Sequence, residues 1–207
     1  MGLFNTLSIN VHYTYDCQMS SLTNIVSFDN EPLILVDEND VVLGHESKIE
    51  AHRGSGLLHR AFSIFLINDQ NEVLLQQRSS DKPLWPEYWS NTCCSHPRRG
   101  ETYEEATQRR LLEELNLSCD LKYLFQFQYQ AQYDSTGAEH ELCSVYIGHV
   151  IGRPSPEYNP TEIADTAWVP TATINDWLSD PDLPTTPWFA MEWQRLVTEY
   201  AQELHIS

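Results

Sequence analysis

Residues 91–117 read NTCCSHPRRGETYEEATQRRLLEELNL, which places two cysteines and a histidine directly before a predicted helix. Thr102 is followed three residues later by Glu105, which is the spacing of a capping box, and helix-forming residues continue to Leu115. The helix carries paired arginines and paired glutamates. A solvated surface does not need thiol, imidazole, guanidinium and carboxylate groups in so short a span, so the stretch indicates a functional site.

Short strands are predicted on both sides of this helix. Alternating apolar and polar residues or short apolar runs predict strands at 33–36, 41–43, 61–67, 73–75, 125–133, 138–150 and 166–169. Residues 48–59 contain two glycines and are predicted to form a loop. A short helix is predicted at 173–178, and Pro187 at a first helical position predicts a last helix reaching about Leu204. Strands and helices do not alternate regularly, so the fold class is α+β.

Length and composition indicate a single soluble domain of 207 residues, with 41% hydrophobic residues. We expect residues 1–30 to form a polar N-terminal extension and residues 31–207 to form the domain. The net charge of −18 argues against binding to nucleic acid or to anionic lipid. Five cysteines do not form a disulfide framework, and no Lys or Arg precedes Lys48. We therefore expect a cytoplasmic protein without a membrane anchor.

Two carboxylates and three histidines are candidate metal ligands. Glu139 and Glu141 lie two apart on a predicted strand and share a face that continues with apolar residues. Either they bind a cation, or the strand end lies at the rim of the sheet, where both reach water. Together with His52, His59 and His96 they would form an octahedral nitrogen and oxygen site for a divalent ion. The spacing does not show that the five residues meet.

Basic residues are few in this acidic chain, which makes them informative. Arg110 and Glu114 are four apart and share a helix face. They form either a surface ion pair or, together with Arg78 and Lys82, a cationic site for phosphate in which Glu114 holds Mg²⁺. Trp188, just inside the last helix, is either a core residue or an aromatic face that stabilises a cation.

Five sequence blocks in register carry a family resemblance: GLLHRAFS at 56–63, LQQRS at 75–79, NTCCSHP at 91–97, EHE at 139–141 and TPWF at 186–189. In this order they resemble type I isopentenyl-diphosphate isomerase over roughly residues 31–205. The resemblance implies a Nudix-like fold, with a mixed β-sheet core flanked by helices. It also implies interconversion of isopentenyl and dimethylallyl diphosphate for isoprenoid biosynthesis.

The helix resembles a degenerate Nudix box. Ser95 and Asn116 stand where a Nudix hydrolase has glycines, and Arg110 replaces the first glutamate of the hydrolytic Arg-Glu-x-x-Glu-Glu cluster. Exchanging a metal-binding carboxylate for a cation favours a reaction that holds diphosphate without cleaving it. A Nudix hydrolase and a non-catalytic relative that binds prenyl diphosphate or a partner protein are the alternatives.

The resemblance implies a role for each candidate residue. A first divalent metal, Mn²⁺, Zn²⁺ or Mg²⁺, would be bound by His52, His59, His96, Glu139 and Glu141. Glu114 would bind a Mg²⁺ that also contacts the substrate diphosphate, and the cationic contacts would be Lys48, Arg78, Lys82 and Arg110. Cys94 and Glu141 would transfer protons on opposite faces of the alkene. Tyr129 would support Glu141, and Trp188 would face the developing carbocation.

Overall fold

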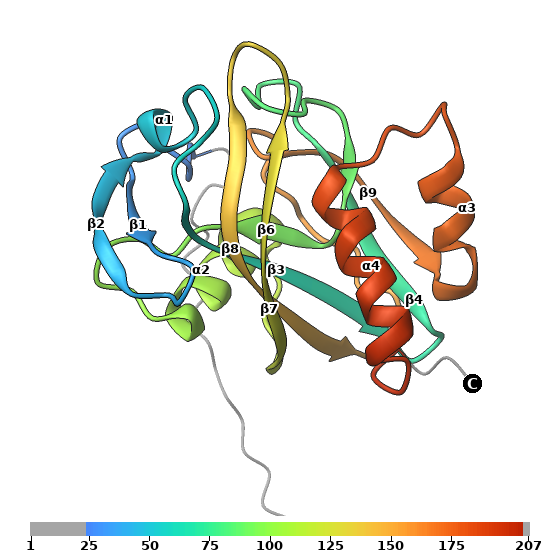
Figure 1. Cartoon of the computed structure of the whole chain (residues 1–207). Helices are drawn as coiled ribbons and strands as arrows, with labels where there is room; N and C mark the ends of the chain where they lie inside the picture. Colours follow the sequence, from blue (N-terminus) through green and yellow to red (C-terminus); the bar gives the residue numbers. More distant parts are fainter. Residues whose placement is uncertain (1–23, 205–207) are drawn as a thin grey trace, which may run out of the picture.

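A computed structural model of the chain describes residues 24–204, which contain one mixed sheet and its flanking helices (Figure 1). The greater part of the expected extension, residues 1–23, lies outside the described residues, as do residues 205–207. The strands are β1 (Pro32–Val36), β2 (Val42–Ser47), β3 (His59–Asn68), β4 (Glu72–Arg78), β5 (Trp89–Ser90), β6 (Cys93–Ser95), β7 (Leu121–Gln132), β8 (Ala138–Val150) and β9 (Ile163–Pro170). The helices are α1 (Lys48–Ala51), α2 (Tyr103–Leu115), α3 (Ile174–Ser179) and α4 (Pro187–Glu199).

Strand β3 is the centre of the sheet. It runs parallel to β8 for ten residue pairs, from His59 opposite Glu141 to Asn68 opposite Val150. On its other side β6 pairs with it antiparallel, and this pairing puts Cys94 opposite Ser63. The β7–β8 hairpin extends one side of the sheet, while β4 and β9 extend the other (Figure 1). The α+β class predicted from the sequence is confirmed.

Both faces of β3 are buried, which explains its nearly continuous apolar sequence. Phe62, Ile64 and Leu66 pack on the side of α2, with the apolar residues of that helix. Phe65 and Ile67 point to the opposite side and pack with the apolar face of α4. The candidate site residues His59 and Cys94 therefore belong to a sheet that is packed between two hydrophobic cores.

Helix α2 begins and ends as its sequence predicts. The Thr102 hydroxyl accepts a hydrogen bond from the Glu105 amide, and the Glu105 carboxylate accepts one in return from the Thr102 amide, which completes the capping box. Asn116 ends the helix in the left-handed conformation, at φ 51°. Asn tolerates this conformation better than most residues, which is why it replaces the expected glycine without loss of the helix end.

Three local predictions need correction. Residues 48–59 are not entirely a loop, because α1 forms over Lys48–Ala51 and carries His52 directly after it. The last helix ends at Glu199, short of Leu204. Strands β5 and β6 were not predicted, since two or three residues are too few to show alternation. No helix within residues 24–204 is long and apolar enough to cross a membrane.

Gly137 fixes the position of the loop that carries His52. A Cβ atom at Gly137 would overlap the His52 carbonyl oxygen, which accepts a hydrogen bond from the Ala138 amide at 3.0 Å. We expect Gly137→Ala to destabilise the fold by about 1–3 kcal/mol through overpacking. The measurement is the midpoint of thermal unfolding. Gly44→Ala is the control, because nothing lies within 4 Å of a Cβ there; equal midpoints for the two variants would contradict the prediction.

Candidate active site

Three histidines from three segments meet at one end of the sheet. His52 follows α1, His59 begins β3, and His96 follows β6. Their ring centroids are separated by 4.8 Å (His52 to His59), 5.2 Å (His52 to His96) and 4.8 Å (His59 to His96). The turn after α1 and the β3–β6 pairing thus bring together side chains that are up to 44 residues apart in the sequence (96 − 52).

Two glutamates of β8 complete the group. Glu139 and Glu141 are each 7% exposed, so the alternative in which they reach water at the rim is wrong. The parallel register sets Glu141 beside His59, and the two-residue period of the strand points Glu139 the same way. Five ligand atoms lie within 4.8 Å of one another. We call this group the histidine–glutamate cluster; its members are His52, His59, His96, Glu139 and Glu141.

Orphaned polar atoms show that the cluster fits a divalent metal ion. Among residues 24–204, His59 Nε2 and His96 Nδ1 are buried without a hydrogen-bond partner, whereas Glu139 Oε2 lies 2.7 Å from His52 Nε2. The Nδ1 atoms of His52 and His59 lie 2.7 Å from the backbone carbonyls of Lys48 and Leu57. Those bonds place a proton on Nδ1 of each ring and direct Nε2 into the cluster, where His52 Nε2 lies 2.7 Å from Glu139 Oε2 and His59 Nε2 has no partner.

Burial and mutual charge set the protonation states of the cluster. Burial lowers the pKa of His59 to about 3 and that of His96 well below its usual value, so both rings are neutral. The pKa of His52 is raised, because the Glu139 carboxylate outweighs the effect of burial. Burial and the neighbouring Glu139 charge raise the pKa of Glu141. Neutral imidazoles and carboxylates are the forms that bind metal, so His59 and His96 are already in that form, whereas a metal would displace protons from His52 and Glu141.

A cavity of about 340 Å³ opens beside the cluster. Its lining includes nearly all of the residues predicted from the sequence, namely Lys48, His52, Arg78, Lys82, Cys94, His96, Arg110, Tyr129, Glu139, Glu141 and Trp188. His59 and Glu114 do not line it. His59 is fully buried behind the cavity wall, and Glu114 lies beneath Arg110.

Cys94 lies in this cavity as a protonated thiol. Its Sγ donates a hydrogen bond to Asn91 Oδ1 at 2.7 Å and lies 3.3 Å from the Trp188 indole nitrogen, which donates to it. Burial raises the pKa of Cys94 to about 12. Cys93 points away and packs against α2, so the two adjacent cysteines have different surroundings.

Tyr129 and Trp188 join the two sides of the cavity. The Tyr129 hydroxyl donates a hydrogen bond to Glu141 Oε2 at 2.7 Å. Its ring centroid is 6.2 Å from that of Trp188, which is 3% exposed. A carboxylate, a phenol, an indole and a thiol therefore follow one another along the wall of a single cavity.

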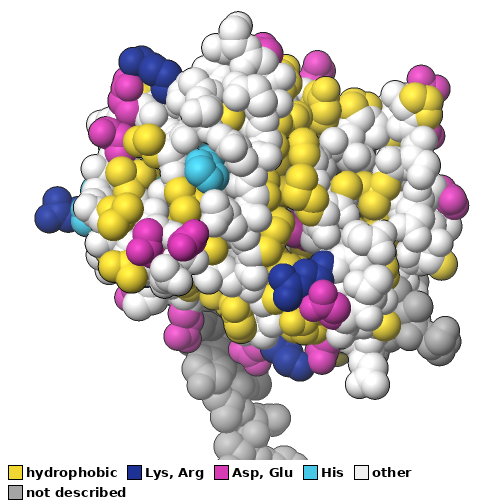
Figure 2. Space-filling view, in the orientation of Figure 1, with side chains coloured by type: hydrophobic (Ala, Val, Ile, Leu, Met, Phe, Trp, Pro, Cys, Tyr) yellow, Lys and Arg dark blue, Asp and Glu magenta, His cyan; other side chains and the backbone are white. Residues whose placement is uncertain are grey.

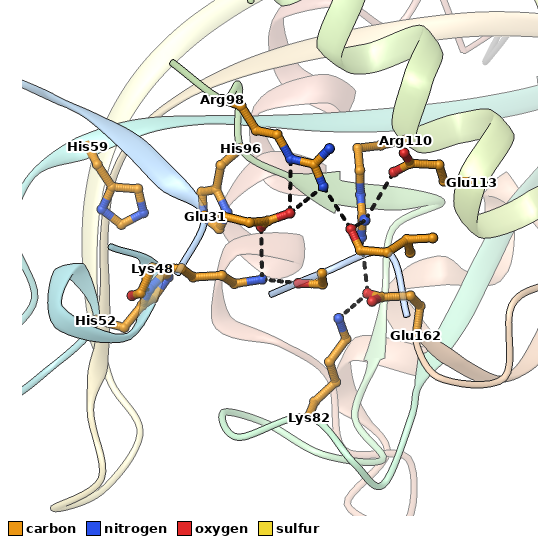
Figure 3. Close-up of polar contacts among 12 residues, drawn as sticks. Glu31, Lys48, His52, His59, Lys82, His96, Arg98, Arg110, Glu113 and Glu162 are labelled. Atoms are coloured by element: carbon orange, nitrogen blue, oxygen red, sulfur yellow. Dashed lines mark hydrogen bonds and ion pairs between the residues drawn. The ribbon is translucent and has the colours of Figure 1, made fainter. Parts of the chain in front are cut away.

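Basic side chains also line the cavity, and Figure 3 labels three of them, Lys48, Lys82 and Arg110. We call Lys48, Arg78, Lys82 and Arg110 the cationic end. Arg110 is 2% exposed and its Nε donates to Glu114 Oε1 at 2.9 Å, so the alternative of a surface ion pair is wrong. Arg78 donates to the backbone carbonyls of Trp85 and Leu84, and its guanidinium carbon lies 5.5 Å from the Trp188 ring centroid. Figure 2 shows only scattered Lys and Arg side chains on the face it presents, without a basic patch.

Sequence reasoning missed two side chains of the site. Asn91 accepts the Cys94 hydrogen bond and anchors its own amide on the Ile64 carbonyl at 3.1 Å. Its only signal was its place in the NTCCSHP block. Glu162 bonds to both Lys82 and Arg110. It stands alone in a loop before β9 and belongs to no motif, so no signal in the sequence could have found it.

Comparison with known proteins agrees with this geometry. A NUDIX domain model matches residues 57–189. A curated Isopentenyl-diphosphate Delta-isomerase 1 of Photorhabdus laumondii is 41% identical over 84% of this chain and 99% of its own length. An isopentenyl-diphosphate delta-isomerase of Schizosaccharomyces pombe is 37% identical, over 90% of this chain and 93% of its own. The chain belongs to the isopentenyl-diphosphate delta-isomerase family.

Solved structures extend the likeness to the fold. The Deinococcus radiodurans protein DR0079 superposes with a TM-score of 0.64 at 25% identity, over 78% of this chain and 96% of that one. A MutT protein of Methanosarcina mazei superposes at 0.54 with 16% identity, over 69% and 96%, which shows a common fold alone. The Nudix-like fold expected from the sequence is therefore confirmed.

Metal binding can be tested through stability. Because the cluster is preformed only in the folded chain, Mn²⁺ or Zn²⁺ should raise the thermal midpoint, by about 2.7 kcal/mol of stability at 100 times the dissociation constant. Glu139→Gln should lose most of this shift. His140→Ala is the control, since the His140 ring lies 3.2 Å from Gln128 rather than in the cluster. Equal metal-induced shifts in both variants would contradict the site.

The protonation of Cys94 can be tested by alkylation. With a pKa of about 12, the fraction of Cys94 in the reactive thiolate form, and so its alkylation rate, should keep increasing with pH through pH 10. The measurement is the iodoacetamide rate constant of the Cys94 peptide, followed by mass spectrometry. Free cysteine is the reference and levels off above its pKa of about 8.5. A plateau of the Cys94 rate below pH 9 would show that burial does not hold the proton on the thiol.

Proposed function

We propose that this protein interconverts isopentenyl and dimethylallyl diphosphate and so serves isoprenoid biosynthesis. One observation carries the proposal: a single cavity is lined by the Cys94 thiol, by Glu141 of the histidine–glutamate cluster and by the cationic end. The substrates differ in the position of one double bond. Their diphosphate fits the cationic end, and their short hydrocarbon fits between Cys94, Tyr129 and Trp188.

The reaction requires one proton to be added and another to be removed. In the isopentenyl to dimethylallyl direction, a C–H bond forms at the terminal alkene carbon and a C–H bond breaks at the allylic methylene. We assign these two transfers to Cys94 and Glu141, one acting as the acid and the other as the base. After one turnover their protonation states are exchanged. Tyr129 holds the Glu141 carboxyl in place through its 2.7 Å hydrogen bond.

Trp188 supports this chemistry by facing the cation that protonation creates. Its indole π face attracts positive charge, and its nitrogen is already directed at Cys94 Sγ. With 3% of its surface exposed, it also keeps water from that side of the cavity. A dry wall matters here because a tertiary carbocation reacts readily with water.

The metal ions would have structural and electrostatic roles. The histidine–glutamate cluster would hold one divalent ion, Mn²⁺, Zn²⁺ or Mg²⁺, which tunes the proton affinity of Glu141 when bound. Glu114 would hold Mg²⁺ against the diphosphate, with Lys48, Arg78, Lys82 and Arg110 as direct contacts. Glu114 Oε2 suits this role, because Arg110 occupies only the Oε1 atom.

Hydrolysis of a nucleoside diphosphate is a second candidate, because the fold is that of Nudix hydrolases. The structure speaks against it at Arg110. The guanidinium stands where a hydrolase has a glutamate and forms an ion pair with Glu114, one of the acids the box retains. A cation in that position lowers the negative charge available for a cluster of catalytic metals.

The residue roles predict the behaviour of two variants. Cys94→Ala and Glu141→Gln should each abolish uptake of deuterium into the substrate from deuterated water, since each removes one proton-transfer group. The measurement is mass spectrometry of the diphosphate pool. Cys119→Ala, away from the cavity, is the control for loss of a cysteine. Full exchange in either variant would refute that residue's role.

The activity itself is tested by mixing the purified protein with isopentenyl diphosphate and Mg²⁺ and analysing for dimethylallyl diphosphate. A chelator should stop the reaction, and Mg²⁺ with Mn²⁺ or Zn²⁺ should restore it. Release of phosphate or a monophosphate without isomerisation would sink the proposal in favour of the hydrolase.

A further inference from the structure

Glu162 bonds to two residues of the cationic end, Lys82 and Arg110, although it belongs to no motif. It precedes β9 and is 3% exposed. Its Oε2 atom accepts hydrogen bonds from Lys82 Nζ and, at 3.0 Å, from Arg110 Nη2 (Figure 3). One carboxylate oxygen therefore bridges two of the proposed diphosphate contacts, which come from a loop and a helix far apart in the sequence.

The loop that carries Glu162 is fixed to both of those elements through its backbone. The Asn159 amide donates to the Glu114 carbonyl near the end of α2 at 2.8 Å. The Ser79 amide donates to the Glu162 carbonyl at 2.9 Å, and the Lys82 amide donates to the Ser79 carbonyl at 3.2 Å. The Glu162 carboxylate is thus held at a fixed place between α2 and the loop that carries Lys82.

Two like charges on flexible side chains do not stay together unaided. Lys82 and Arg110 repel each other, and an ammonium on a four-carbon chain has many other rotamers. Lys82 is mostly buried, with 16% of its side chain exposed. A shared buried anion holds both cations in one arrangement before any substrate arrives, which reduces the entropy lost on binding.

We propose that Glu162 is a positioning residue of the diphosphate site, whose carboxylate holds Lys82 and Arg110 in the arrangement that binds diphosphate. This proposal rests on the proposed function. Glu162 itself repels the substrate and does not contact it. Its effect therefore falls on substrate binding, whereas the proton transfers of Cys94 and Glu141 proceed without it.

Simple charge balance makes the opposite prediction. If Glu162 only neutralised nearby cations, its removal would leave the cationic end more positive and would strengthen the binding of an anion. Positioning predicts weaker binding, because the freed cations move apart. Glu162→Gln separates the two hypotheses by whether pyrophosphate affinity falls or rises. Glu162→Asp keeps the charge but has a shorter side chain, so charge balance predicts unchanged affinity and positioning predicts weaker affinity.

The experiment measures inorganic pyrophosphate binding by titration calorimetry in the presence of Mg²⁺, together with isomerase kinetics. We expect Glu162→Gln to weaken pyrophosphate binding and to raise KM by about tenfold, the loss typical of one charge-assisted hydrogen bond. The kcat value should change much less than KM. Glu162→Asp should show a smaller loss in the same direction.

Glu72→Gln is the matched control, since Glu72 is also a buried acid, 4% exposed, that accepts from an arginine, Arg153 Nε, at 2.6 Å. Glu72 bonds to Asn68 and Arg153 and to no member of the cationic end, so its loss should lower stability without changing pyrophosphate affinity. Unchanged or tighter binding in Glu162→Gln would overturn the proposal. Should that variant fail to fold, wild-type affinity in Glu162→Asp would overturn it equally. Pyrophosphate binding is measured without turnover, so a failure of the isomerase assay remains a separate result.

Discussion

The parallel pairing of β3 with β8 is the constraint on which the site depends. It sets His59 beside Glu141, and the two-residue period then fixes the side of the sheet on which Glu139 lies. A slip of one residue would turn both glutamates to the opposite face. The slip is prevented by apolar side chains on both faces of β3, which would lose their cores at the same time. Hydrophobic packing thus holds a polar site in register.

The same sheet allows one cavity to contain groups with opposite requirements. Acid–base chemistry on an alkene needs a dry wall, whereas a diphosphate needs buried charge. The cavity lining contains both, with Cys94 and Trp188 as one part and the cationic end as the other, and the two parts meet where the Arg78 guanidinium carbon lies 5.5 Å from the Trp188 ring centroid. Helix α2 contributes to the second part through Arg110, the residue that distinguishes its box from that of a hydrolase. The fold is shared with hydrolases, and a few side chains change the chemistry it supports.

Much of the fold was predictable from local sequence patterns. The α2 helix showed its capping box, and the bounds of β8 were predicted at both ends because the turn residues at 134–137 follow an alternating strand and lead into its partner. The short elements α1, β5 and β6 were not predicted, because they depend on tertiary pairing rather than on their own residues. The family resemblance named eleven of the eighteen residues that line the cavity. It named neither Glu162 nor Asn91 as a functional residue, since each acts through partners that only the folded chain brings near.

The charge of the cationic end explains how so acidic a chain accepts an anionic substrate. Surface charges more than a Debye length away, about 8 Å at physiological ionic strength, are screened by salt. The buried groups at the cationic end are not screened in this way, and there Arg110 is paired with Glu114 and Glu162 while Lys48 lies 3.9 Å from Glu31. These carboxylates hold the cations in place and also offset part of their positive charge. A divalent ion held by Glu114, as proposed above, would add positive charge here, and substrate binding would then depend on metal at the site rather than on attraction to the surface.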